Sequence, residues 1–191
     1  YTERRQVLTT SVQQENELGA QAYAQILSEA GSSVICSNLS RQCAPAQENL
    51  VDVVREIGDD LRRAAIAYER ELIAAGYPVE PKAESFDWTF NVIQSDQPNA
   101  FCLPGGYVAV YTGMLDVTGN FDGQVTAADV IDRDKLAVVM GHEIAHALAR
   151  HGGERMSQGR ILQVGQMAIG VAADSRCLLY TSPSPRDNPA S

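Results

Sequence analysis

The chain has 191 residues, 45% of them hydrophobic, so it can bury one core of ordinary size and we expect a single domain. Its formal net charge of -9 comes without a basic stripe or interleaved basic and aromatic residues, which leaves nucleic-acid binding without support. No apolar run approaches the roughly 20 residues that span a bilayer. The longest, residues 161–173, is interrupted by glutamines and glycines.

The first half of the chain is predicted to be helical. Residues 12–30 and 46–75 carry apolar side chains at helical spacing, and Gly31 and Gly76 stand where each helix would end. One apolar stripe of the second helix is assigned to core packing and not to a ligand site. The stripe consists of Leu50, Val53, Val54, Ile57, Leu61, Ala65, Tyr68 and Leu72.

Two cysteines, Cys36 and Cys43, lie between these helices in a stretch rich in serine, asparagine and glutamine. Their spacing could close a small disulfide in an oxidising compartment such as the periplasm. The alternative is a pair of free thiols.

Strand-like composition follows the helices. Residues 86–93 and 107–111 are rich in aromatic and β-branched side chains, and the turn Pro104-Gly105-Gly106 is expected to connect these two strands. Residues 118–129 match a calcium-binding loop only in part and are interpreted as an acidic surface insertion. The elements together predict an α+β fold, mainly helical, with a small sheet.

All three histidines fall within residues 142–151, and His142, Glu143 and His146 form a His-Glu-x-x-His motif. On a helix, residues i and i+4 lie only about 40° apart around the axis, so two imidazoles can bind one metal ion. The intervening glutamate can then act as the base of a metal-assisted peptide hydrolysis. Apolar neighbours from Leu136 to Leu148 predict a helix that is buried on most sides.

The neighbouring residues favour this interpretation over its alternatives. Histidines of an ordinary helix are disfavoured, because unpaired buried imidazole and carboxylate groups are costly. The metzincin subclass is excluded, because that pattern requires glycine and histidine where the chain has Ala149 and Gly152. His151 would lie about 180° around a continuing helix from His142, so we expect it to be structural or exposed.

Two motifs in order carry a family resemblance. The segment Asn99-Ala100-Phe101-Cys102-Leu103-Pro104-Gly105-Gly106, followed by Gly-His-Glu-x-x-His, resembles the HtpX-like and Oma-like zinc metallopeptidases of peptidase family M48. Residues 15–19 and Arg150-His151 also resemble the soluble-domain branch of that family. The resemblance extends from Thr2 to about Asp174.

The resemblance implies a zincin-like (gluzincin) domain with a small β-sheet beside the zinc-binding helix. It implies a zinc endopeptidase that acts on membrane-associated or misfolded envelope proteins, with His142 and His146 as Zn²⁺ ligands and Glu143 as the general base. An extended substrate would bind along a strand edge near this helix, with an ordinary core strand as the alternative for residues 107–111. The expected substrate-binding residues are Asn99, Gly105, Gly106, Tyr107, Val108 and Ala109.

The implied location is the bacterial periplasm or envelope, with the mitochondrial inner membrane as the alternative. The implied partners are unfolded or membrane-associated protein substrates, and the full-length protein could associate peripherally with a membrane.

The third zinc ligand is missing from the expected pattern. In the resembling family it is a glutamate in a downstream Glu-x-x-x-Asp motif, and none of Glu154, Asp174 and Asp187 is a convincing substitute. Residues 177–187 match what a transposase-type sequencing adapter would encode, with a natural Pro/Ser-rich terminus as the alternative. We therefore expect a catalytic domain over residues 1–176, incomplete at its C-terminus and also at its N-terminus, and a disordered adapter-derived tail over residues 177–191. The alternatives to an active enzyme are a non-catalytic chaperone-like binding module and an inert fragment.

Overall fold

The structure is a computed structural model, and it describes residues 10–36, 43–119 and 131–152. The predicted acidic insertion from residue 120, the apolar stretch 161–173, the three acidic candidates for the third ligand and the tail lie outside these residues. The helices are α1 (Val12–Ala30), α2 (Pro45–Ala74), α3 (Thr112–Thr118) and α4 (Arg133–Leu148), with short 3-10 turns η1 (Gly31–Ser33) and η2 (Ala83–Ser85). The strands are β1 (Thr89–Ile93), β2 (Ala100–Leu103) and β3 (Tyr107–Tyr111), which confirms the mainly helical α+β class.

The three strands form one sheet in the order β1-β3-β2. β1 pairs with β3 in parallel, and β2 pairs with β3 antiparallel. The prediction that Pro104-Gly105-Gly106 joins the two strands of residues 86–93 and 107–111 is wrong, because this turn joins β2 to β3. A turn this short can only reverse the chain, whereas parallel neighbours need a longer crossover.

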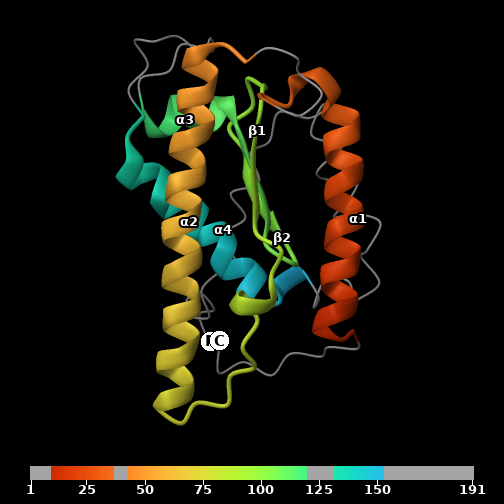
Figure 1. Cartoon of the computed structure of the whole chain (residues 1–191), viewed down its shortest axis with the longest axis vertical. Coiled ribbons are helices and arrows are strands. Elements are labelled where there is room, and N and C mark those ends of the chain that lie inside the picture. The colour runs from red at the N-terminus through yellow and green to blue at the C-terminus, as the bar shows by residue number, and fades with distance from the viewer. Residues whose placement is uncertain (1–9, 37–42, 120–130, 153–191) are drawn as a thin grey trace, which may run out of the picture.

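Helices cover both faces of the sheet (Figure 1), with α1 on one side and α2 on the other, while α4 crosses behind β2. The alternation of β3 side chains divides the core accordingly. Ala109 packs in a cluster with Tyr23 and Ile26 of α1. Val108 and Val110 belong to the larger cluster built with α2 and α4. Among the described helices, none is both long enough and apolar enough to cross a membrane.

Helix α1 begins with a reciprocal cap and approaches the β2–β3 turn closely. The Ser11 hydroxyl accepts a hydrogen bond from the Gln14 amide at 3.2 Å, and the Gln14 side chain accepts one from the Ser11 amide at 3.0 Å. Gly19 faces Pro104 so closely that an added Cβ would lie 1.9 Å from the proline carbonyl oxygen. Only glycine therefore allows α1 to pack against this turn.

Helix α2 places an acidic side chain in the core where the sequence predicted an aromatic one. Tyr68 is 51% exposed, so its assignment to the core stripe is wrong, whereas the adjacent Glu69 is only 2% exposed. The Glu69 carboxylate accepts hydrogen bonds from the backbone amides of Lys82 at 2.9 Å and Ala83 at 2.8 Å. These bonds fix the start of η2 against α2, and the need for buried amides to find acceptors explains the buried acid.

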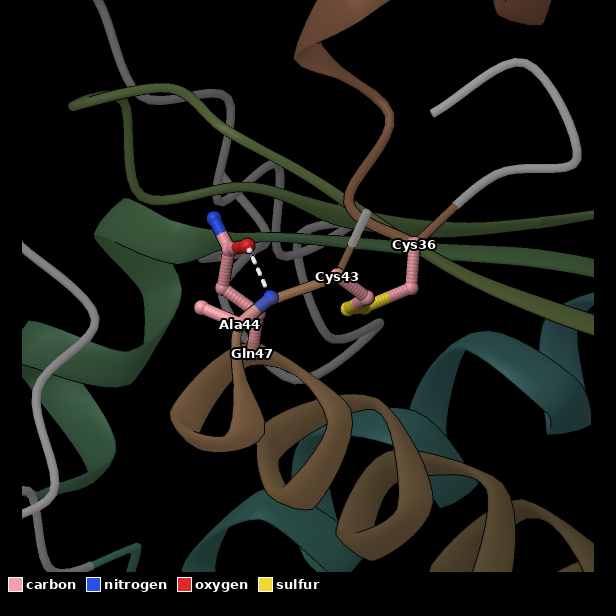
Figure 2. The surroundings of a disulfide bond; sticks show 4 residues. All are labelled: Cys36, Cys43, Ala44 and Gln47. Carbon is pink, nitrogen blue, oxygen red and sulfur yellow. Dashed lines mark hydrogen bonds between the residues drawn. A yellow bond between two sulfur atoms is a disulfide. The ribbon is translucent and has the colours of Figure 1, made fainter. Parts of the chain in front are cut away.

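Of the two alternatives for Cys36 and Cys43, the structure contains the disulfide. The Ile35 amide donates to Val92 O at 2.9 Å, which lays the segment before Cys36 along the outer edge of β1. Cys36 then bonds to Cys43, with 5.1 Å between their Cα atoms. Figure 2 shows the disulfide beside the first turn of α2, where the Ala44 amide donates to the Gln47 side chain at 3.2 Å. The disulfide therefore joins one sheet edge to the start of α2.

Replacing Gly19 with alanine should lower the free energy of unfolding by about 1–3 kcal/mol, because the new methyl group forces α1 away from Pro104. Gly141→Ala is the matched control, since it is also helical and its added Cβ would meet Leu61 only at 3.4 Å. That variant should be neutral or stabilised by up to about 1 kcal/mol through helix propensity. Urea denaturation measures both, and equal stabilities would contradict the close packing of α1.

Replacing Glu69 with alanine should lower the free energy of unfolding by about 1–3 kcal/mol, because two buried amides lose their acceptor. Glu71→Ala removes an exposed acid from the same helix and should change stability by no more than about 0.5 kcal/mol. Thermal and urea unfolding of the two variants provide the comparison. A Glu69→Ala protein as stable as Glu71→Ala would show that Glu69 does not hold η2.

Candidate metal centre on helix α4

Helix α4 has one buried face and one open face. The Asp132 carboxylate caps it by accepting a hydrogen bond from the Lys135 amide at 3.1 Å. The buried side chains recur at helical spacing and are Leu136, Met140, Ile144, Ala147 and Leu148. The prediction of burial on most sides is wrong, because Val138 is 73% exposed and Ala145 is also exposed. The open face also carries His142.

The two histidines of the motif point their ring nitrogens at each other. His142 Nε2 and His146 Nε2 lie 2.9 Å apart, and the ring centroids are separated by 4.4 Å. Two imidazole nitrogens that converge in this way suit a divalent metal such as zinc. Within residues 10–36, 43–119 and 131–152, no group of three or more His, Cys, Asp and Glu side chains could hold a metal ion. The described donor set therefore contains two imidazoles.

Glu143 lies on the side of α4 that faces β2. It is half-buried, and its negative charge adds to the effect of burial in raising the pKa of the Cys102 thiol above its ordinary value. Cys102 belongs to β2, so the carboxylate and the edge strand are electrostatic neighbours. The motif glutamate is therefore within electrostatic reach of a strand of the sheet.

Helix α4 does not continue as far as His151, so this residue does not lie opposite His142, and its contact with His146 agrees with the structural role that was one of the two expectations. Helix α4 ends at Leu148, and Arg150 adopts a φ of 57°. This left-handed conformation costs a residue with a side chain about 1–2 kcal/mol. The turn brings His151 back toward the helix, where its Nδ1 lies 2.6 Å from His146 Nδ1.

Arg150 is held in this turn by an acid from the first helix. Its Nε and Nη2 donate to the two carboxylate oxygens of Glu15 at 3.1 and 2.7 Å, and Nη2 also donates to Thr10 O at 2.6 Å. The side chains of Arg150 and Glu15 are only 15% and 3% exposed. The hydrogen bonds and charge of Glu15 raise the pKa of Arg150, so the guanidinium stays protonated.

No role was predicted for Glu15, although a signal for one was present in the sequence. Glu15, Gly19 and Tyr23 recur every four residues, and all three are buried. An acidic residue within such a row needs a charged or hydrogen-bonding partner.

The predicted substrate-binding segment is divided between a turn and a central strand. β3 is paired on both sides, so the prediction of a free edge at residues 107–111 is wrong. Tyr107 is half-buried, the side chains of Val108 and Ala109 are buried, and Asn99 O accepts a hydrogen bond from the Tyr111 amide at 2.9 Å. Gly105 and Gly106 have φ values of 94° and 85°, which explains both glycines by the turn itself.

β2 is the edge strand beside α4, the helix that carries the His-Glu-x-x-His motif. Asn99 bonds to Tyr111 across the β2–β3 ladder, and hydrogen-bonded pairs alternate in an antiparallel ladder. Phe101 therefore turns its backbone polar groups toward β3, while Ala100 and Cys102 turn theirs to the other side. No other described strand pairs with that side of β2.

Comparison with known proteins agrees with this arrangement. Residues 63–177, more than half of the chain, match the model of Peptidase family M48. The match includes α4, the edge strand β2 and the turn that follows it.

Individual relatives are named as metalloendopeptidases. Metalloendopeptidase OMA1, mitochondrial, of Bos taurus is 35% identical over 82 residues, which cover 43% of this chain and 13% of that protein. Mitochondrial metalloendopeptidase OMA1 of Schizosaccharomyces pombe is 40% identical over 70 residues (37% and 17%), and that of Saccharomyces cerevisiae is 35% identical over 80 residues (41% and 20%). The matched regions thus span a fifth or less of these relatives. The chain belongs to Peptidase family M48.

Proposed function

We propose that this chain carries the active centre of a zinc-dependent endopeptidase. His142 and His146 would hold zinc through Nε2, and Glu143 would serve as the general base. The observation that carries the proposal is the convergence of the two Nε2 atoms at 2.9 Å on the open face of α4, with the charge of Glu143 acting on Cys102 of the edge strand. A carboxylate from outside the described residues would supply the third ligand, as structural and catalytic zinc sites need at least three protein donors.

The residues present divide the work of peptide hydrolysis between them. A bound zinc ion supplies Lewis acidity, which makes water more acidic and polarises a carbonyl group. The Glu143 carboxylate takes the proton from the attacking water and later delivers it to the leaving amine. Because Glu143 faces β2, a peptide lying along that strand would present its carbonyl groups on the side where the proton is accepted. The histidines contribute position, and the glutamate contributes proton transfer.

The edge strand β2 suits an extended peptide as substrate. The outward backbone groups of Ala100 and Cys102 could pair with a substrate by strand addition, which depends on main-chain hydrogen bonds and tolerates many side chains. Folded proteins rarely offer a free extended segment, so misfolded or membrane-associated proteins would be the natural substrates, in a role in protein quality control. This assignment replaces the central strand β3 with β2 as the place of binding.

The cellular compartment is inferred from the names of the relatives and from the disulfide. The relatives above are named as mitochondrial proteins, which favours the mitochondrial alternative over the bacterial periplasm. The disulfide between Cys36 and Cys43 supports an oxidising environment, which excludes neither location. We propose that the catalytic centre works in an oxidising compartment, next to a membrane that holds its substrates.

A binding module without catalysis is the second candidate. It is favoured by one observation, the presence of only two metal donors among the described residues. Such a module would keep the β2 edge and bind unfolded segments without cleaving them. Zinc content distinguishes the two, because two imidazoles alone hold the metal weakly.

Replacing Glu143 with glutamine should leave zinc bound but reduce casein hydrolysis by at least about 100-fold, since the amide cannot accept the proton of water. Asp134→Asn, an exposed acid of the same helix, should retain activity and serves as the control. Both are measured in the protein expressed with any further sequence that its gene encodes, with zinc determined by metal analysis. Unchanged hydrolysis by Glu143→Gln would rule out this residue as the base. A zinc-free, inactive wild type would favour the binding module.

Substrate binding along β2 predicts a pattern with a period of two residues. A series of peptide substrates, each carrying one N-methyl group on a different amide, should lose about tenfold or more in kcat/KM at alternate positions, because only every second amide faces the strand. The unmethylated peptide is the control. Equal losses at neighbouring positions, or no loss at any, would contradict strand addition.

A further inference from the structure

His146 uses its two ring nitrogens in opposite directions. Nε2 faces His142 at 2.9 Å, and Nδ1 faces His151 Nδ1 at 2.6 Å. A neutral imidazole carries its proton on one nitrogen and has a lone pair on the other. If Nε2 is to bind a metal, the proton must be on Nδ1, and the His151 nitrogen next to it must be the acceptor.

We propose that His151 is a positioning residue that fixes the tautomer and ring orientation of His146, and that Glu15 keeps it in place through Arg150. The proposal rests on the proposed function, because it concerns a ligand of the same metal. Ligand histidines commonly donate their second N–H to a carboxylate, a carbonyl or water. Here an imidazole five residues farther along the chain takes that place.

The position of His151 depends on the turn at Arg150. A helix continued past Leu148 would carry His151 to the opposite side of α4, away from His142 and out of reach of His146 Nδ1. The left-handed turn at Arg150 reverses this direction, and the fork of hydrogen bonds to Glu15 holds the arginine there. Glu15 therefore acts on the metal centre from the first turns of α1, although its own side chain lies beside Arg150 and not beside His146.

Two further charged residues lie beside the turn at Arg150. The Arg150 guanidinium also lies 3.8 Å from the Glu80 carboxylate, and the buried Lys82 amine donates to Glu80 O at 2.9 Å. Gly152 also lies close to the β2–β3 turn, because a Cβ added to it would be 3.3 Å from the Pro104 ring. The turn is thus held by α1, by the loop before η2 and by the β2–β3 turn.

The test uses a matched pair of substitutions. Asparagine places an acceptor oxygen where His151 has Nδ1, and leucine has the same shape without an acceptor. Long-range proton–nitrogen NMR of the metal-free wild type should show the His146 proton on Nδ1. His151→Asn should retain that signature, and His151→Leu should lose it. Zinc affinity, measured by chelator competition, should fall about 10–100-fold in His151→Leu and stay within about threefold in His151→Asn.

Glu15→Gln tests the remote part of the proposal. It should weaken zinc binding about threefold to tenfold and reduce the His146 Nδ1 signature, because the arginine loses one charged partner. Glu17→Gln, an exposed acid of the same helix, should change neither. Equal zinc affinity in His151→Leu and the wild type, or a metal-free wild type with the His146 proton on Nε2, would overturn the proposal. A wild type that binds no zinc but keeps the Nδ1 signature would overturn the proposed function, while the pairing of the two histidines would be supported.

Discussion

Arg150 carries a full positive charge into a nearly closed space at the end of α4, and the Glu15 carboxylate neutralises it there with two hydrogen bonds. A buried charge without a partner is strongly unfavourable, so the helix that bears Glu15 must stay docked for Arg150 to remain where it is. The same docking needs Gly19, which allows α1 to approach Pro104. One ion pair therefore joins the first helix, the β2–β3 turn and the end of the helix that carries the histidines.

The two faces of α4 have different roles. Its buried side chains, such as Met140 and Ile144, fix the helix against the sheet and α2, while His142 remains on the open side. Glu143 faces β2, whose outward backbone groups suit an extended peptide. Rigid packing on one side thus holds His142, Glu143 and His146 at a constant distance from the edge strand.

Much of the fold could be predicted from the sequence, because local patterns decide it. Helix α1 occupies residues 12–30 as predicted, since apolar spacing and the glycine at position 31 are local signals. The burial of Glu69 in place of Tyr68 could not be predicted, because the Glu69 carboxylate accepts its hydrogen bonds from amides more than ten residues away. The prediction of which strands the turn connects was wrong for the same reason, since strand pairing is a tertiary property. At the candidate centre, the motif indicated His142, Glu143 and His146, but the left-handed arginine that returns His151 to them has no sequence signature.

The two kinds of contact that build the centre differ greatly in how much chain they enclose. The sheet is assembled from residues 89–111, whereas Glu15 and Arg150 lie 135 residues apart. Closing a long loop costs more chain entropy, so the sheet can form early and the ion pair must form late. The reverse holds during partial opening of the native state, in which α1 can detach while the sheet stays intact. The geometry of the histidines is then lost well before the core unfolds, so hydrogen exchange in α1 would report on the integrity of the centre more directly than exchange in the strands.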